Sequence, residues 1–269
     1  MGGREIELKS RIWLIGGTSD SAEIARVLAE SNLPLVISVT TAAATALYAD
    51  SAVIRVGCLD RWQMKQFCQE NSIGAIVDAS HPYAVAVSSQ AVAVAKELNL
   101  PYLRYERQHY QTPTPISNDA QRLDLASFEQ LLAGDYLIDK RVLLTVGCKV
   151  LPQFRSWQSR AILFARILPK IASLETAIAA GFSSDRIIAI RPPISLATET
   201  ALWQQWQISL VVTKASGKVG GEDIKQQVAT NLGIPLVVIA RPPMTYPQQT
   251  SQLKDVLSFS CRYLDRHSN

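Results

Sequence analysis

A short turn rich in glycine and hydroxyl side chains follows the first strongly apolar run of the sequence. Residues 11–16 read RIWLIG, typical of a buried strand, and residues 16–20 read Gly-Gly-Thr-Ser-Asp. Glycines at a strand-to-helix turn let backbone N–H groups approach phosphate oxygens, and the positive end of the helix dipole favours an anion. The spacing is not G-x-G-x-x-G, so two interpretations stay open. The turn binds a nucleotide, or it is a plain turn in which Ser19 or Asp20 caps the helix.

The end of the second apolar run bears on which nucleotide would bind. Residues 38–41 read Ser-Val-Thr-Thr, without the Asp or Glu that would hold the 2′-hydroxyl of an adenine ribose. The missing acid permits a 2′-phosphate there, which favours NADPH over NADH.

A second polar group, Asp78, Ser80, His81 and Tyr83, follows the fourth predicted strand. Open α/β sheets bind ligands at the carboxyl ends of their strands, and a histidine there can donate a proton near neutral pH. The alternative is that Asp78 caps backbone N–H groups while His81-Pro82 turns the chain.

Cationic residues follow several later strands. Arg104 and Arg107 could bind carboxylates with their two-pronged guanidinium groups, or pair with Glu106 on the surface. Arg166 ends another strand. Residues 213–221 read TKASGKVGG, which suits the binding of anionic groups, with a mobile connection as the alternative. Tyr136 and Lys140 match the Y-x-x-x-K pattern of short-chain dehydrogenases, but so short a pattern arises by chance in roughly 0.3 places in a chain of this composition, and no long helix carries it.

Short apolar runs alternate with amphipathic segments along the whole chain. The runs are nearly continuous in Val, Ile and Leu, which is typical of strands covered on both faces. Helices are expected over 21–32, 60–72 and 86–99, and the segment 111–119 (QTPTPISND) is expected to be a linker. We therefore expect an α/β protein of two Rossmann-like domains, each with a mostly parallel sheet flanked by helices, over residues 1–115 and 116–269.

Composition narrows the classes of function. The chain has 269 residues, 48% hydrophobic and 19% charged, with a net charge of +4, which suits a small anionic ligand rather than a nucleic acid. Four cysteines without a C-x-x-C pair and three scattered histidines predict neither a disulfide framework nor a metal site. No apolar run is long enough to span a membrane, and a cytoplasmic location is expected.

These motifs, in this order, resemble the precorrin-6A reductase family, which includes the cobalt-precorrin-6A reductases. The resemblance covers residues of about 11–243 and rests on GGTSD, VDASHPYA, PYLRYERQ, LLTVGCK, ARILP, VVTKASGKVGGEDIK and IPLVVIARPP. It implies an NADPH-dependent enzyme of cobalamin biosynthesis that reduces one double bond of a macrocycle to give precorrin-6B or its cobalt form. It also implies transient contact with neighbouring enzymes of the pathway.

Three sets of site residues are expected on this basis. His81 would donate the proton that accompanies the hydride, with Asp78 orienting it, and bulk water is the rival donor. The cofactor would contact Gly16, Gly17, Thr18, Ser19, Asp20 and Thr40. The substrate would contact Tyr83, Arg104, Arg107, Arg166, Lys214, Ser216, Gly217, Gly220 and Gly221.

The chain departs from the family pattern at three positions. Asp20 stands where the family usually has Glu, Ala215 where an acidic residue is common, and Pro192 where Gly is common. Two other functions stay open from the residues: a different NADP-dependent reductase, and a non-catalytic module that binds a tetrapyrrole or nucleotide.

Overall fold

The chain folds as two compact units in a computed structural model that describes residues 10–49, 52–106, 122–217 and 220–264. The first unit is made of residues 1–108 and 243–269, and the second of residues 109–242. The expected boundary at 115/116 and the expected linker 111–119 lie outside the described residues. The tail after residue 243, expected in the second domain, belongs instead to the first unit.

Parallel strands form the sheet of the first unit, in the order β12-β5-β4-β1-β2-β3. These strands are β1 (Arg11–Ile15), β2 (Leu35–Val39), β3 (Ile54–Val56), β4 (Ile73–Asp78), β5 (Tyr102–Tyr105) and β12 (Gln249–Thr250). The central strands are apolar on both sides because helices cover both faces. The helices are α1 (Ser19–Glu30), α2 (Arg61–Glu70), α3 (Val85–Glu97) and α8 (Leu253–Leu264), with the 3₁₀ helix η1 (Ala42–Leu47) after β2.

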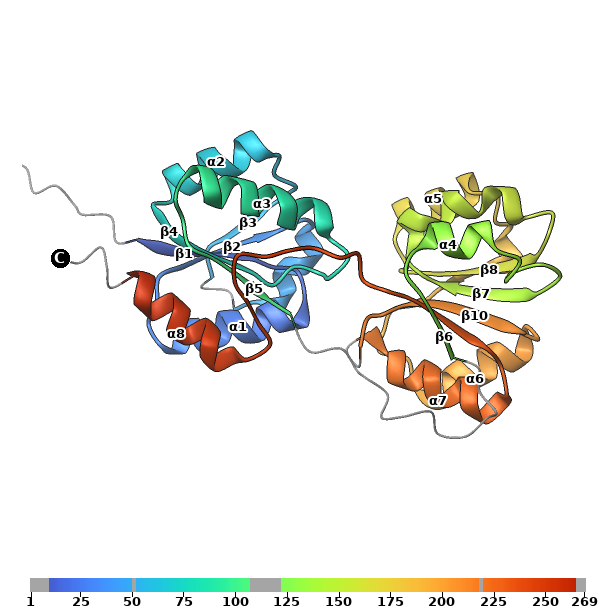
Figure 1. Ribbon diagram of the computed structural model, residues 1–269. Helices are drawn as coiled ribbons and strands as arrows, with labels where there is room; N and C mark the ends of the chain where they lie inside the picture. The colour runs from blue at the N-terminus through green and yellow to red at the C-terminus, as the bar shows by residue number, and fades with distance from the viewer. Residues whose placement is uncertain (1–9, 50–51, 107–121, 218–219, 265–269) are drawn as a thin grey trace, which may run out of the picture. The chain divides into compact units, whose positions relative to one another are not determined.

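Alternate residues of β1 show how the two faces are filled. Trp13 packs in one core with Met64 and Phe67 of α2, whereas Leu14 packs in the other with Leu28 of α1 and residues of α8. Figure 1 shows the same division, with α2 and α3 on one face of the sheet and α1 and α8 on the other.

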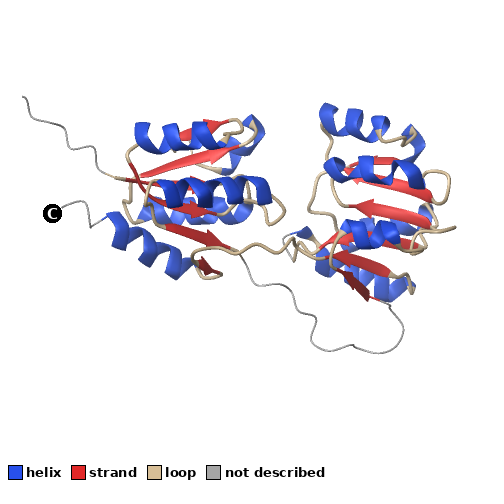
Figure 2. Cartoon of the chain, turned by 45° about the horizontal axis from the view of Figure 1, so that its top comes forward, coloured by secondary structure: helices blue, strands red, loops and turns tan. Residues whose placement is uncertain are grey.

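The second unit repeats this layering with the strand order β6-β11-β10-β7-β8-β9, again all parallel. Its strands are β6 (Arg122–Leu125), β7 (Arg141–Thr145), β8 (Ile162–Ile167), β9 (Ile187–Ala189), β10 (Leu210–Lys214) and β11 (Leu236–Ile239). Its α-helices are α4 (Phe128–Ala133), α5 (Ile171–Ala179), α6 (Leu196–Gln205) and α7 (Glu222–Leu232), and its 3₁₀ helices are η2 (Cys148–Trp157) and η3 (Ser184–Arg186). Helices lie on both faces of each sheet (Figure 2).

The two strand orders place a topological switch point in each sheet. In the first unit β1 lies between β2 and β4, and in the second β7 lies between β8 and β10. At such a point the connections leave toward opposite faces, which opens a crevice outside the carboxyl ends of the strands. The polar turns after β1 and β4 therefore lie at one switch point, and those after β7 and β10 at the other.

The expected α/β class with two parallel, helix-flanked sheets is confirmed. The three helices expected in the first half form within two residues of their predicted starts. The outermost strands β6 and β12 bring each sheet to six strands, and both lack the continuous apolar run that predicts a buried strand. Among the described residues, no helix combines the length and hydropathy that a membrane crossing requires.

Candidate functional site

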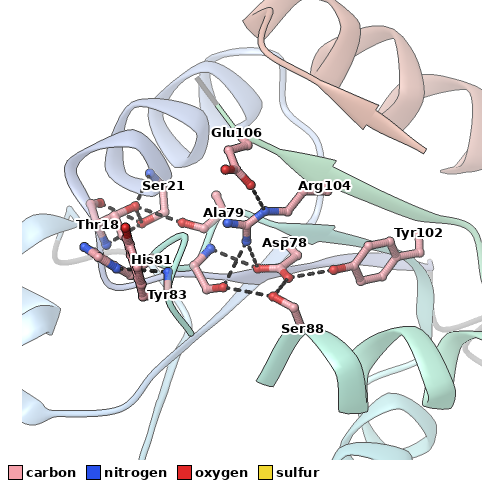
Figure 3. A network of polar contacts seen from close by, with 11 residues as sticks. Thr18, Ser21, Asp78, Ala79, His81, Tyr83, Ser88, Tyr102, Arg104 and Glu106 are labelled. Carbon is pink, nitrogen blue, oxygen red and sulfur yellow. Dashed lines mark hydrogen bonds and ion pairs between the residues drawn. The ribbon is translucent and has the colours of Figure 1, made fainter. Parts of the chain in front are cut away.

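The turn after β1 is built around Thr18, which caps α1. The Thr18 hydroxyl accepts the N–H of Ser21 at 3.1 Å, and the Ser21 hydroxyl accepts the N–H of Thr18 at 3.0 Å. Thr18 also donates its hydroxyl proton to the carbonyl of Ala79 at 2.9 Å, which ties the turn to the end of β4 (Figure 3). The helix cap is therefore Thr18, not Ser19 or Asp20, and α1 begins at Ser19.

Two adjacent positions of this turn, Gly16 and Gly17, require glycine for different structural reasons. Gly17 has φ +102°, a conformation that side chains disfavour, and the space at its missing Cβ is open. Gly16 instead faces the hydroxyl of Tyr48, and a Cβ there would overlap that oxygen. The Tyr48 hydroxyl accepts the N–H of Gly17 at 2.7 Å. Tyr48 lies in a segment far along the chain, and no motif in the sequence points to it.

Two residues with hydroxyl side chains, Ser38 and Thr40, lie at the carboxyl end of β2. Ser38 is buried and accepts the indole N–H of Trp13 at 2.9 Å, so it stabilises the sheet. Thr40, the residue assigned to the cofactor, is exposed beyond the end of the strand.

Asp78, at the end of β4, is completely buried and accepts hydrogen bonds from four donors (Figure 3). These are the N–H of Ser80 (2.9 Å), the hydroxyls of Ser88 (2.5 Å) and Tyr102 (2.6 Å), and the Arg104 guanidinium (2.9 Å). Burial and the adjacent Asp78 carboxylate raise the pKa of Tyr102 far above its usual range, so Tyr102 stays a donor. His81, which the structure describes, is not among the four donors. Asp78 holds the turn at the N–H of Ser80, the residue before His81.

Arg104, on β5, lies inside the first unit rather than at its surface. Its guanidinium contacts the carboxylates of Asp78 and Glu106 at 2.9 and 3.1 Å and donates to the hydroxyl of Ser80 at 3.0 Å. It also lies 5.4 Å from the ring centroid of Tyr246. Although burial alone would lower the pKa of Arg104, these neighbours raise it above its usual value. Its exposed fraction is 0%, which differs from the expectation that it binds a substrate carboxylate.

His81 and Tyr83 lie on the turn that follows. His81 is exposed and Tyr83 half-buried. The Nδ1 atom of His81 accepts the N–H of Tyr83 at 3.3 Å, and the two ring centroids are 5.9 Å apart. Because Nδ1 accepts, the proton of the neutral ring lies on Nε2. Arg107, expected to bind a substrate carboxylate or to pair with Glu106, lies outside the described residues.

Two buried charged side chains of α7, Glu222 and Lys225, hold the loop that precedes this helix in the second unit. This loop, within residues 213–221, is called the glycine loop. Glu222 accepts the N–H of Gly217 at 2.8 Å and pairs with Arg122 at 3.1 Å. Lys225 donates to the carbonyls of Gly220 and Gly221, both at 2.9 Å. Each side chain is only 3% exposed, and burial lowers the pKa of Lys225 to about 8.

Glycine is required at all three described glycines of this loop. Gly217 and Gly221 have φ near +65°, and a Cβ on Gly220 would overlap the hydroxyl of the half-buried Ser216. The residues that hold the loop were not anticipated from the sequence. The signal available was a Glu and a Lys three positions apart at the start of the next helix.

The cations at the carboxyl edge of the second sheet have different surroundings. Arg166 forms an ion pair with the buried Glu199, which differs from the expectation that it binds substrate. Lys214 is half-buried 5.8 Å from the centroid of the Phe128 ring, and burial is the main cause that lowers its pKa. Arg241, not anticipated as a site residue, follows β11 and donates to the carbonyl of Ala215 at 2.9 Å. No cluster of His, Cys, Asp and Glu able to hold a metal ion occurs within the described ranges.

Comparison with known proteins places these motifs in a family. Residues 11–260 match the family model described as precorrin-6x reductase CbiJ/CobK. A cobalt-precorrin-6A reductase of Synechocystis sp. is 44% identical over 264 residues, which cover 96% of this chain and 99% of the relative. A cobalt-precorrin-6A reductase of Priestia megaterium is 32% identical, covering 91% and 96%. A solved structure of CobK precorrin-6A reductase shares the fold with a TM-score of 0.75 at 20% identity, covering 94% of this chain and 97% of that one.

Proposed function

Because the chain belongs to the precorrin-6x reductase CbiJ/CobK family, whose members are oxidoreductases of cobalamin biosynthesis, we propose that it reduces precorrin-6A or its cobalt form with NADPH. The reaction adds a hydride to one atom of a conjugated double bond of the macrocycle and a proton to its neighbour, giving the 6B form. The match over residues 11–260 carries this proposal.

The turn after β1 is the proposed binding site for the cofactor, which supplies the hydride when bound. Gly17 is exposed, the space beside it is open, and α1 presents its N-terminus there. Thr18 and Ser19 begin that helix, and Thr40 is exposed at the end of β2. Since no acid ends β2, the chain is expected to accept the 2′-phosphate of NADPH.

His81 is the proposed proton donor. It is exposed at the switch point of the first sheet, and the imidazolium form of its ring can give up a proton near neutral pH, which leaves the neutral ring. The turn that bears it is fixed by the bonds of Ser80 to Asp78 and Arg104. We accordingly propose Asp78 and Arg104 as positioning residues and Tyr83 as a substrate contact.

The substrate carries many carboxylates, and cations at the carboxyl edge of the second sheet are the proposed partners. Lys214 and the glycine loop lie beside the switch point between β7 and β10. Arg241 adjoins them through its bond to Ala215. We propose that Lys214, Arg241 and Ser216 bind substrate carboxylates.

A direct assay tests the function. The purified chain is mixed with NADPH and either precorrin-6A or cobalt-precorrin-6A, and nicotinamide absorbance is followed with the visible spectrum of the macrocycle. We expect oxidation of NADPH that depends on one of the two substrates and is slower with NADH. NADPH binding without oxidation would favour a non-catalytic module, and oxidation with simple ketones alone would favour a different reductase.

A further inference from the structure

The hydroxyl of Tyr48 occupies the turn that is proposed to bind the cofactor. Tyr48 follows η1 and packs, half-buried, against the core of the first unit. Its oxygen lies 2.7 Å from the nitrogen of Gly17 and 2.7 Å from the hydroxyl of Ser21. Ser21 is itself completely buried at the start of α1.

The protons of these hydroxyls can be assigned from the contacts. Ser21 donates its single hydroxyl proton to the carbonyl of Thr18 at 2.7 Å, and Thr18 donates its own to Ala79 at 2.9 Å. Tyr48 must therefore donate in its bond to Ser21, because each hydroxyl has one proton. Toward Gly17 the same oxygen is an acceptor at the N-terminus of a helix, which is the role of a phosphate oxygen in such turns.

The space around the two glycines allows exchange of one acceptor for another. Gly16 has no side chain to overlap the Tyr48 oxygen, so the phenol reaches the turn from one side. Gly17 is exposed and open on the other side. One N–H group has one proton, so a phosphate oxygen and Tyr48 compete for the same donor.

From this geometry we propose that Tyr48 is a further residue of the cofactor site, whose hydroxyl holds the position of a cofactor phosphate oxygen and is displaced when the nucleotide binds. The inference rests on the proposed function, because it concerns the same turn. It predicts the direction in which the affinity for the nucleotide changes when the Tyr48 hydroxyl is removed. Removal of the hydroxyl destabilises the ligand-free turn but not the occupied one, so it strengthens nucleotide binding.

The test is a titration of NADPH without macrocycle, followed by nicotinamide fluorescence, on the wild type and Tyr48→Phe. The variant keeps the ring packing and loses the two hydrogen bonds. We expect its Kd for NADPH to fall on the order of tenfold, the effect of about one hydrogen bond of ordinary net strength. Tyr136→Phe, in the second unit, is the matched control and should leave the Kd unchanged.

Thermal unfolding provides an independent readout. Ligand-free Tyr48→Phe should melt below the wild type, and the two should melt together at saturating NADPH. If Tyr48→Phe binds NADPH with unchanged or weaker affinity while the wild type binds it, the inference is overturned and the cofactor proposal stands. A wild type that binds no NADPH overturns both.

Discussion

At the scale of single residues, Arg104 and Asp78 form an ion pair inside the first unit, with side chains 1% and 0% exposed. Charges that leave water are costly unless they are paired and hydrogen-bonded, and Asp78 has four donors. The pair fixes Ser80, the residue before His81. The ion pair therefore fixes the position of the turn that bears His81.

Arg104→Met should destabilise the protein by about 3–5 kcal/mol, because the Asp78 carboxylate is left buried without its partner. Urea unfolding measures this, and Asp78→Asn in the same background should recover part of the loss. The control is Arg26→Met, which removes a pair with Glu30 whose side chains are both 61% exposed, and should cost no more than about 0.5 kcal/mol. Equal effects of the two single variants would contradict the buried-pair argument.

His81→Ala should lower kcat by about 10²–10⁴-fold if His81 is the general acid, with little change in the Kd for NADPH. Ser89→Ala, at an exposed position of α3, serves as the control. Turnover near that of the wild type would assign the proton to water instead.

The sequence predicted which strand ends carry several of these residues, but not whether their side chains point outward to a ligand or inward to the core. Asp78 and Arg104 were expected at the carboxyl edge, and they are at strand ends there. Both side chains turn inward, because Tyr102, Ser88 and Glu106 provide partners that no local pattern reveals. Arg166 likewise has a partner that no local pattern reveals, since Glu199 lies 33 residues away in the chain.

At the scale of elements, the start of α7 fixes the glycine loop that precedes it. Lys225 faces Arg166 from β8, Glu199 from α6, and Glu222 and Asp223 from its own helix. Burial is the largest cause of its lowered pKa, and Arg166 lowers it further. The Lys225 amine therefore holds the loop, although burial and the nearby Arg166 disfavour its protonated form.

This arrangement predicts a stability that rises with pH. The pKa of Lys225 is about 8 in the folded state and near the ordinary 10.5 when unfolded. Between these values the unfolded chain binds more protons, so the free energy of unfolding should increase as pH rises through this window, by about 3 kcal/mol in total.

The measurement compares wild type and Lys225→Met by urea unfolding across that window, because the difference isolates the titration of Lys225. Lys140→Met, which removes an exposed lysine of the same unit, is the control variant. A constant difference between wild type and Lys225→Met would contradict the shift.

Elements with a strong apolar pattern were predictable, and short edge strands were not. β1, β4, β7 and β10 are buried on both faces and read as continuous apolar runs. β6 reads Arg-Leu-Asp-Leu, with two exposed middle residues, and β12 has only two residues. Their pairing depends on neighbours in the sheet, which one segment alone does not encode.

At the scale of the whole molecule, the first unit is built from two segments of the chain. Val256 and Phe259 of α8 are buried against the sheet, and β12 pairs with β5. Tyr246, on the returning segment, stacks on Tyr102 with centroids 6.4 Å apart. The sequence assigned this tail to the second domain by its position in the chain, because an amphipathic helix fits either sheet and no local pattern selects the first.

A chain that ends at Pro242 should therefore lose the first unit and keep the second. Hydrogen exchange followed by mass spectrometry should show fast exchange in β1 and β4 and retained protection in β7 and β10. Protection of β1 and β4 at the level of the full chain would show that the returning segment is dispensable.

The discontinuous first unit also determines an order of events during synthesis. The ribosome synthesises the described strands of the second unit before β12 and α8, although the first unit starts nearer the N-terminus. Domains fold as units while they emerge. The nascent chain thus completes its later-encoded half first, and the β1–β4 switch point acquires its full support only after translation has passed residue 264.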